Sequence, residues 1–352
     1  MSNASTLGAL LEAARLTLSR APRLSLSDGQ ARREARALAA GVLRREKSVV
    51  RAADDTDDDT DDDTDVAVEA LLRAPSASAL ALACSPGTAR ALERAARRRA
   101  RGEPLAYVLG EKEFWSMALH VDRHCLIPRP DSETLVEAMV DHCCRGVQQS
   151  TVQQSTETEE AGGATPLRRL RVADLYTGSG PLLLAALSEL PSHTTGVGFD
   201  ISAGALRVAR RNARRHGLEA RASFVEQDLS LPMPPASWDI VFANPPYIRS
   251  EDMRGLMTDV RDFEPALALD GGPDGLAPYR DIASAVQDGR LQSQWLFLEI
   301  GNDQAGDVKD IFNGIAAAAP GGQLNPLMDM VEVRKDLAGM DRCIVLRGKS
   351  LK

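Results

Sequence analysis

The spacing of apolar residues predicts helices over the first third of the chain. In residues 1–104, alanine, leucine and arginine are abundant and aromatic side chains are almost absent. Leucines and alanines recur every three or four positions, which is the spacing of amphipathic helices that pack into a small bundle. Ser27 or Asp28 is suited to cap the second helix and Thr88 the last. The predicted helices are residues 5–19, 28–46, 66–73, 76–83 and 87–101.

The pattern changes from helical spacing to alternation after this bundle. Residues 105–130 alternate apolar and polar side chains around Gly110, which predicts a β-hairpin. The alternation ends at two prolines, and Asp131 or Ser132 then begins a helix that runs to Val140. We expect the hairpin to link the helical bundle to a second domain.

Short apolar runs alternate with helical segments from residue 171 onward. The runs are rich in β-branched residues, as strands inside a sheet are. Pro181 opens one intervening helix, where a proline is favourable, and residues 203–216 form the next. This alternation predicts an α/β fold with a doubly wound, mainly parallel sheet over residues 131–352. The predicted strands are residues 171–175, 195–199, 222–225, 238–243 and 295–300.

Two low-complexity stretches interrupt these patterns. Residues 54–65 hold nine aspartates, and residues 147–165 contain a repeated VQQST. Neither has enough apolar side chains to form a core, so both are expected to be solvated insertions. The acidic stretch lacks the glycine turn and the distal glutamate of a calcium loop. Without its nine aspartates, the net charge of −8 becomes about +1.

The composition excludes several classes of protein. Apolar residues make up 43% and charged residues 26%, which is ordinary for a soluble globular protein. No apolar run reaches the roughly 18 to 20 residues of a membrane span. The N-terminus weakly resembles a transit peptide, but its helical spacing favours a structural helix. The cysteines form no C-x-x-C and do not cluster with histidines, so a zinc site or a disulfide framework is not indicated and a reducing compartment fits.

Arginines follow one side of the predicted helix 87–101. Such a stripe can bind nucleic-acid phosphates, but no aromatic residues are interleaved with it. We therefore interpret it as a solvated helix face.

Candidate chemistry gathers at the ends of the predicted strands. Ligands of doubly wound sheets bind outside the carboxyl ends of the strands. A glycine loop with Gly178 and Gly180 follows the first strand, and Asp200 ends the second. This combination is typical of sites for nucleoside cofactors, in which the acid binds the ribose. Leu183 stands where a dinucleotide site has its third glycine, and no Walker-type lysine is present.

The segment Asn244-Pro245-Pro246-Tyr247 ends the strand 238–243 with a rigid corner. Its prolines fix φ twice and remove two N–H donors, so the sheet ladder stops there. The Asn244 side-chain oxygen and the Pro245 carbonyl are two preorganised acceptors, and Tyr247 offers a flat face. Together they can aim the nitrogen of an amide or exocyclic amine at a methyl group on a sulfonium. This corner therefore favours methyl transfer to such a nitrogen.

The chain resembles the HemK/PrmC family of protein-(glutamine-N5) methyltransferases, which modify the Gly-Gly-Gln motif of class 1 peptide chain release factors. The NPPY corner is shared with DNA adenine methyltransferases. The LIPRPDSE segment and the FEPALALDGGPDGL segment are more specific and favour the release-factor branch over a branch that methylates a ribosomal protein. The segments that carry the resemblance, in family order, are RGEPLAYVLGEKEFWSMALHV, LIPRPDSE, VADLYTGSG, GFDIS, FANPPYI, VRDFEPALALDGGPDGLAPYR, LEIGNDQ and VRKDLAG.

The resemblance implies a Rossmann-like class I S-adenosylmethionine-dependent methyltransferase domain behind a helical domain, residues 1–104, that docks the release factor. It implies a monomer with no metal, no membrane and no required nucleic acid, in the mitochondrial matrix of a eukaryote or the cytoplasm of a bacterium. Asn244, Pro245 and Tyr247 would be catalytic, and with Pro246 they would bind the glutamine. The implied cofactor contacts are Tyr176, Thr177, Gly178, Ser179, Gly180, Asp200, Asp228, Leu229 and Asn244.

Tyr176 departs from the family pattern, which has glycine at this position. We expect its side chain either to crowd the loop or to require a negative φ. Two other functions stay open: an N6-adenine or other nucleic-acid methyltransferase that uses the same corner, and a non-catalytic binding module whose cofactor loop is impaired by Tyr176. The chain also contains Gly-Gly-Gln at 321–323, which follows an alanine-rich segment and is interpreted as a helix end.

Overall fold

The computed structural model describes residues 6–53, 84–144, 169–231, 235–318 and 324–349. The two low-complexity stretches, the predicted helices 66–73 and 76–83 and the Gly-Gly-Gln at 321–323 lie outside these ranges. The chain forms two compact units: Met1–Gly110 with Met257–Phe263, and Glu111–Leu256 with Glu264–Lys352. In the described ranges, no helix has the length and apolarity that a membrane crossing requires.

The first unit is helical, as predicted. Thr6 caps its first helix by accepting a hydrogen bond from the Ala9 amide. Leucines and alanines on three helices form its core, with Leu7, Leu38 and Leu92 almost fully buried. The second helix continues past residue 46, since neither glycine nor proline interrupts residues 42–53. The helices are α1 (Leu7–Ser19), α2 (Asp28–Ala53), α5 (Pro86–Ala100), α6 (Leu105–Leu109) and α11 (Thr258–Phe263).

Carboxylates pair several arginines of the α5 stripe. Arg99 is buried and forms a bidentate ion pair with Glu34 of α2, with a shortest N–O distance of 2.8 Å. Arg97 pairs with Glu93, and Arg98 pairs with a neighbouring glutamate. Arg97 and Arg98 are exposed, in agreement with a solvated helix face, whereas Arg99 points into the bundle and joins α5 to α2.

The hairpin exists, but its turn is not at Gly110. Gly110 has a φ of 71° and ends α6 in the left-handed conformation that favours glycine at this position. The turn lies five residues later, at Trp115 and Ser116, which both have positive φ. Positive φ at both central residues is the conformation of a type I′ two-residue hairpin turn. Trp115 adopts it while its indole donates to Glu189, a tertiary contact that no local pattern reveals. The strands are β1 (Glu111–Phe114) and β2 (Met117–His120).

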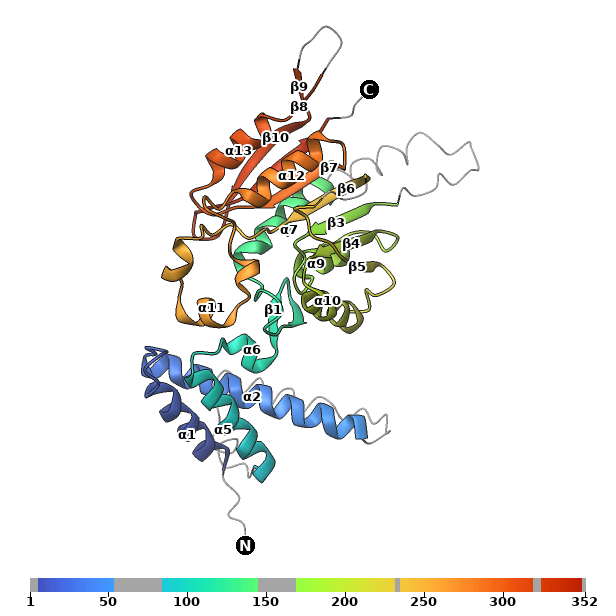
Figure 1. Ribbon diagram of the computed structural model, residues 1–352. Helices are drawn as coiled ribbons and strands as arrows, with labels where there is room; N and C mark the ends of the chain where they lie inside the picture. Colours follow the sequence, from blue (N-terminus) through green and yellow to red (C-terminus); the bar gives the residue numbers. More distant parts are fainter. Residues whose placement is uncertain (1–5, 54–83, 145–168, 232–234, 319–323, 350–352) are drawn as a thin grey trace, which may run out of the picture. The chain divides into compact units, whose positions relative to one another are not determined.

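The second unit is built on a seven-stranded sheet in the order β10-β11-β7-β6-β3-β4-β5 (Figure 1). Strands β3 to β7 are parallel, which confirms the doubly wound prediction. The last two strands, not among the predicted ones, form an antiparallel pair that adds to β7. The strands are β3 (Arg171–Leu175), β4 (Thr195–Asp200), β5 (Ala222–Glu226), β6 (Ala236–Ala243), β7 (Leu291–Glu299), β10 (Met328–Lys335) and β11 (Asp341–Gly348); a separate pair joins β8 (Ala316–Ala318) and β9 (Leu324–Pro326).

Helices cover both faces of this sheet and bury a core on each. One core packs α7 (Glu133–Met139), α9 (Pro181–Glu189) and α10 (Ala203–Arg215) against the sheet. The opposite core packs α12 (Ala277–Gln287) and α13 (Ala305–Asn313). Because both faces are covered, the carboxyl edge of the parallel strands is where loops open to a ligand.

Candidate active site

Strand register brings four polar side chains into one row. Leu175 pairs with Phe199 on one side and with Ala243 on the other, and Ala243 pairs with Leu298. The residue that follows each of these lies at the same carboxyl edge of the sheet. The row consists of Tyr176, Asp200, Asn244 and Glu299.

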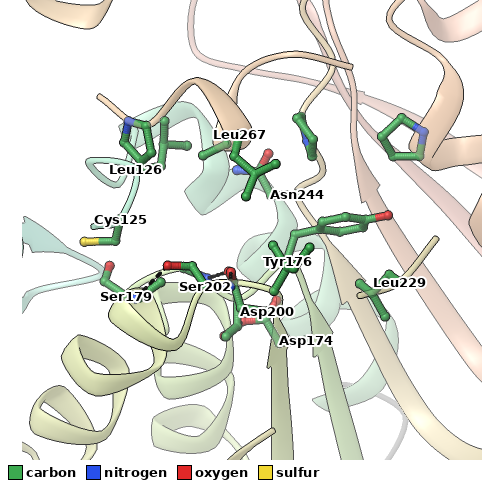
Figure 2. A pocket seen from close by; sticks show the side chains of 18 of the residues that line it. Cys125, Leu126, Asp174, Tyr176, Ser179, Asp200, Ser202, Leu229, Asn244 and Leu267 are labelled. Carbon is green, nitrogen blue, oxygen red and sulfur yellow. Dashed lines mark hydrogen bonds between the residues drawn. The ribbon is translucent and has the colours of Figure 1, made fainter. Parts of the chain in front are cut away.

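A cavity of about 380 Å³ opens above this edge, which is the size of a small-molecule site (Figure 2). Asn244 and residues 176–179 of the glycine turn both line it, so the two predicted centres share one space. Gly180, Pro245 and Tyr247 adjoin lining residues in the chain but do not form the wall. The predicted residues that line it are Tyr176, Thr177, Gly178, Ser179, Asp200, Asp228, Leu229, Asn244 and Pro246.

The two glycines of the loop serve different purposes. Both have positive φ, 55° at Gly178 and 87° at Gly180. A Cβ added to Gly178 would meet no atom within 4 Å, whereas one on Gly180 would contact Ala209 and Leu184 at 3.4 Å. Gly178 therefore leaves its space to the cavity, and Gly180 allows the loop to pack against neighbouring helices.

Tyr176 contradicts the expectation of a negative φ. Its φ is 63°, in the left-handed region that non-glycine residues rarely adopt. The side chain is partly buried, lines the cavity and packs against the sheet core. Burial raises the pKa of its phenol, and so do the charges of Asp281 and Asp228. The loop thus keeps its turn with tyrosine at this position, because ring packing offsets backbone strain.

Two aspartates accept hydrogen bonds from the glycine loop and fix its position. Asp200 Oδ2 accepts the Gly178 amide and its Oδ1 accepts the Ser202 amide, both at 2.8 Å. Asp174 is fully buried and accepts the Thr177 hydroxyl at 2.6 Å. Burial raises the pKa of Asp174 to about 7, against the opposing effect of this hydrogen bond. Asp174 was not among the predicted site residues, although an acid one position before the end of a strand that precedes a glycine loop was visible in the sequence.

The far side of the cavity is acidic. Asp228 accepts hydrogen bonds from the amide and hydroxyl of Ser230, and Leu229 packs partly buried beside it. Burial and the charge of Asp228 raise the pKa of Asp281 on α12. The carboxylates of Asp228 and Asp281 can accept hydrogen bonds from the N–H or O–H groups of a polar ligand.

Ser132 and Glu299 fix the side chains of the proline corner. Asn244 Nδ2 donates to Ser132 Oγ at 3.2 Å, which leaves the amide oxygen as the end free to accept from a ligand. The Tyr247 phenol donates to Glu299 Oε1, also at 3.2 Å. Both partners come from distant parts of the sequence, and neither was among the predicted site residues.

A glycine loop clamps the backbone of the same corner. A Cβ on Gly271 would lie 2.7 Å from the Pro246 carbonyl oxygen, and one on Gly275 only 2.4 Å from that of Tyr247. Gln304 donates to the Tyr247 carbonyl at 3.0 Å and thereby ties the corner to the start of α13. This close packing explains why the corner is followed by a segment with repeated glycines.

A buried ion pair joins two walls of the cavity. Glu264 accepts the Ile127 amide through one oxygen and pairs with Arg129 through the other, at 2.5 Å. The Glu264 side chain is 1% exposed. The pair connects the segment before α7 with the segment that supplies Pro265 and Leu267 to the rim. The two most family-specific segments of the sequence are therefore in direct contact.

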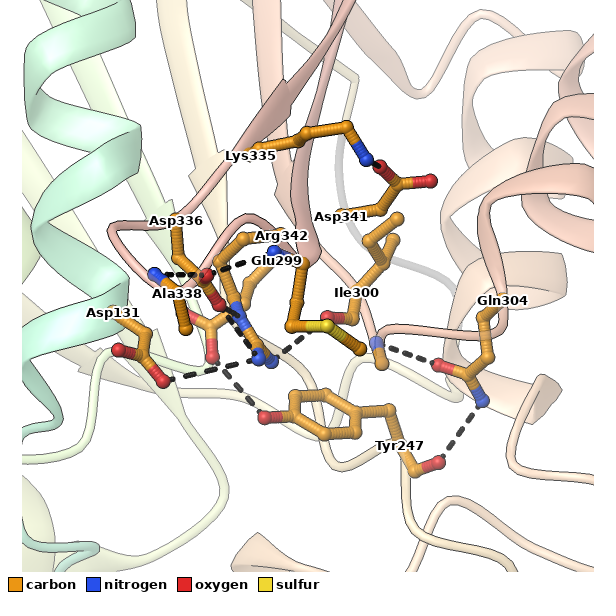
Figure 3. A network of polar contacts seen from close by, with 12 residues as sticks. Asp131, Tyr247, Glu299, Ile300, Gln304, Lys335, Asp336, Ala338, Asp341 and Arg342 are labelled. Atoms are coloured by element: carbon orange, nitrogen blue, oxygen red, sulfur yellow. Dashed lines mark hydrogen bonds and ion pairs between the residues drawn. The ribbon is translucent and has the colours of Figure 1, made fainter.

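A polar network centred on Arg342 lies beside the corner, and Glu299 joins it there with a hydrogen bond from Tyr247 (Figure 3). Glu299 is fully buried at the end of β7, and its Oε2 has no hydrogen-bond partner among the described residues. Burial raises its pKa to about 7, opposed by the nearby Ser132 hydroxyl, by the charge of Arg342 and by the hydrogen bond from Tyr247. Arg342 in turn binds Asp336 and approaches Asp131.

The described residues contain no group of three His, Cys, Asp or Glu that could hold a metal ion. None of the four cysteines whose side chains are described forms a disulfide bond. Cys125 lines the cavity, and burial raises the pKa of its thiol to about 12, so it is not a thiolate nucleophile at neutral pH.

Known proteins are similar to this chain over most of its length. The family model "Methyltransferase small domain" matches residues 164–260. A release factor glutamine methyltransferase of Rhodospirillum rubrum is 38% identical over 266 residues, which cover 76% of this chain and 71% of the relative. Relatives with the same name from Caulobacter vibrioides and Moorella thermoacetica are 35% and 37% identical. Those matches cover 70% and 74% of this chain, and 74% and 81% of the relatives.

Proposed function

The chain belongs to the release factor glutamine methyltransferase family, and we propose that its cavity binds S-adenosylmethionine next to a release-factor glutamine. The protein is a methyltransferase of the class I fold that uses S-adenosylmethionine and modifies a release factor. The assignment of individual residues to cofactor and substrate is our proposal. The observation that carries it is the single cavity shared by the glycine turn and Asn244.

The loop residues fit the cofactor. Gly178 leaves open space where any side chain would intrude, and its amide is already held by Asp200. We propose that Tyr176, Thr177, Gly178, Ser179 and Gly180 surround the cofactor, that Asp200 binds its ribose hydroxyls, and that Asp228 and Leu229 lie beside its adenine. Each oxygen of Asp200 accepts one backbone amide and retains a second lone pair for a hydroxyl donor.

The proline corner fits a primary amide. The bound cofactor supplies a methyl group on a positively charged sulfur. Asn244 Oδ1 and the Pro245 carbonyl then accept hydrogen bonds from the glutamine NH2, which orients the nitrogen and stabilises the positive charge that develops on it. Pro246 lines the same space and Tyr247 holds the corner from behind. Positioning supplies the rate, and no dedicated general base is required.

The substrate is a large protein, so a second contact surface is needed. We propose that the helical unit docks the class 1 release factor, that the hairpin β1–β2 connects it to the catalytic unit, and that the enzyme is a monomer. The pairing of arginines on α5 speaks against a phosphate-binding role for this unit.

Mass spectrometry of modified substrates tests this function. The protein is incubated with S-adenosylmethionine and, in separate reactions, with a class 1 release factor, a release factor with Gln→Ala in its Gly-Gly-Gln, ribosomal proteins and DNA. We expect one added methyl on the glutamine of the intact motif and none in the other reactions. Methylated adenine or a methylated ribosomal protein would reject the proposal.

A further inference from the structure

The side chain of Asn212 joins the hairpin to the glycine loop. Asn212 lies on α10 and is completely buried. Its Oδ1 accepts the His120 amide at 2.7 Å, and its Nδ2 donates to the His120 carbonyl at 3.0 Å and to the Ser179 carbonyl at 2.9 Å. One side chain therefore connects the end of β2, α10 and the loop that follows β3.

The amide of Asn212 has a single possible orientation. A backbone N–H can only donate and a carbonyl can only accept, so Oδ1 must face the His120 amide and Nδ2 must face the two carbonyls. Both N–H bonds of Nδ2 are used. A serine at this position has one donor instead of two, so it would leave a buried carbonyl without a partner.

These contacts fix the peptide group between Ser179 and Gly180. The Ser179 carbonyl and the Gly180 amide belong to one planar unit. Asn212 holds the carbonyl, and the Thr177 carbonyl accepts the Gly180 amide at 2.8 Å. Because this peptide is held at both ends, the backbone that carries the Ser179 side chain keeps one orientation toward the cavity.

The Ser179 hydroxyl lacks a hydrogen-bond partner. Ser179 lines the cavity but is only 1% exposed, and its Oγ has no partner among the described residues. Cys125 lies beside it (Figure 2), but the Cys125 thiol donates to the Asp122 carbonyl at 3.4 Å. A buried hydroxyl without a partner costs free energy, which a ligand that supplies the partner recovers.

The place of Ser179 in the cavity indicates which part of the cofactor it meets. Figure 2 shows Ser179 and Leu229 on opposite sides of Asp200. With adenine beside Leu229 and ribose on Asp200, the part of S-adenosylmethionine that reaches Ser179 is the methionine end. This end carries one carboxylate and one ammonium group, and a hydroxyl can donate to the first or accept from the second.

We propose that Asn212 is a positioning residue for the cofactor. It fixes Ser179 against the hairpin so that the Ser179 hydroxyl binds the methionine end of S-adenosylmethionine. This inference rests on the proposed cofactor site. Asn212 is not among the residues that line the cavity, so it acts on cofactor affinity through Ser179 and not by contact.

Calorimetric titration with two ligands tests the inference without turnover. S-adenosylhomocysteine and methylthioadenosine share the adenosine and the sulfur, and only the first has the amino-acid end. Ser179→Ala should bind S-adenosylhomocysteine about 10-fold more weakly and methylthioadenosine as tightly as the wild type does. The matched control is Thr194→Val, because Thr194 has a buried hydroxyl without a partner among the described residues and lies outside the cavity lining. It should bind both ligands as the wild type does.

Asn212→Ser tests the positioning itself. It should show the same selective loss of S-adenosylhomocysteine affinity, and in turnover it should raise KM for S-adenosylmethionine about 10-fold with a much smaller change in kcat. His216→Ala is its control. His216 Nε2 lies 3.0 Å from the Ala118 carbonyl oxygen, a contact between the end of α10 and the hairpin that does not involve the glycine loop. This variant should keep wild-type affinity for both ligands.

The selectivity between the two ligands decides the outcome. Equal losses for both ligands, or wild-type affinity for S-adenosylhomocysteine, in either variant would overturn the inference. Ser179→Ala removes a hydroxyl that has no partner to lose, so it should fold as the wild type does and keeps the test valid if Asn212→Ser is unstable. Wild-type protein that binds neither ligand would instead reject the proposed cofactor site.

Discussion

The two ends of the cavity are built in different ways. The glycine loop of the cofactor end is held by two aspartates within residues 174–200, and these hydrogen bonds join neighbours in one βαβ unit. The substrate end brings together the corner 244–247, Ser132, Glu299 and the glycine loop 271–275. The first is a local turn with one face open to the cavity, whereas the second is assembled from distant segments that pack closely against its backbone and side chains. A chain can tolerate change at the open end more easily than at the clamped end.

In each end of the cavity, one buried acid accepts a hydrogen bond that holds a site residue in place. Asp174 supports the cofactor loop and Glu299 supports the corner, and burial raises the pKa of each to about 7. In both cases the acid satisfies donors that a neutral apolar residue would leave unpaired. The two ends differ in how closely their backbone is packed, and the following variants test that difference.

The largest expected effect is the pH dependence of stability that Asp174 causes. Its pKa is higher in the folded protein than in the unfolded chain, so its contribution to stability is present below about pH 4 and is lost as the pH rises to about 7. A pKa difference of this size corresponds to about 4 kcal/mol. Asp174→Asn should therefore lose less stability than the wild type between pH 4 and pH 8 in denaturant unfolding.

The matched control for that variant is Asp310→Asn, which changes an exposed acid on α13. It should follow the wild-type curve over the same range. If the unfolding free energies of Asp174→Asn and the wild type changed in parallel with pH, ionisation of Asp174 would not destabilise the folded protein. That result would contradict the account.

The second effect is steric and belongs to the clamped end. In Gly275→Ala the new Cβ would lie 2.4 Å from the Tyr247 carbonyl oxygen at a φ of 73°. Overpacking and backbone strain together should cost about 3 kcal/mol of unfolding free energy. Gly289→Ala has a similar φ of 68° and no contact closer than 3.8 Å, so it should cost only about 1 kcal/mol. Equal losses in the two variants would mean that the loop does not clamp the corner.

The third and smallest effect concerns the open end. Gly178→Ala should lose only about 1 kcal/mol of stability, because its Cβ meets nothing and only the positive φ is strained. Its affinity for S-adenosylmethionine should fall about 10-fold in calorimetric titration, since the methyl enters space that the cofactor needs. Gly217→Ala, with a φ of 66° and equally open surroundings on the surface, should show the same strain and unchanged affinity. Unchanged affinity in Gly178→Ala as well would place the cofactor elsewhere.

The sequence revealed the parts of this molecule that depend on local patterns. Alternating strands and helices predicted the parallel sheet, and strand ends marked Asp200 and Asn244, which strand register then brought to one edge. Local pattern was misleading at Gly110, because a glycine suits both a hairpin turn and a helix end. It was also misleading at Tyr176, whose positive φ depends on packing of the ring against the sheet.

The remaining residues of the site depend on contacts between distant segments. Ser132 and Asn244 are 112 positions apart, and Tyr247 and Glu299 are 52 apart. Nothing near Ser132 in the chain distinguishes it from an ordinary helix cap. Glu299 had a weak signal, since it is an acid that ends an apolar strand as Asp200 does. Its partners, however, become evident only from the order of the strands in the sheet.

Single-turnover methyl transfer by Asn244→Ala tests the central claim most directly. With S-adenosylmethionine and release factor both saturating, the rate should fall about 100-fold to 1,000-fold, because one of two oriented acceptors is lost. Cofactor affinity should change little, and Asn313→Ala, an exposed asparagine on α13, should match the wild type. A wild-type rate in Asn244→Ala would contradict the claim that the corner holds the glutamine amide.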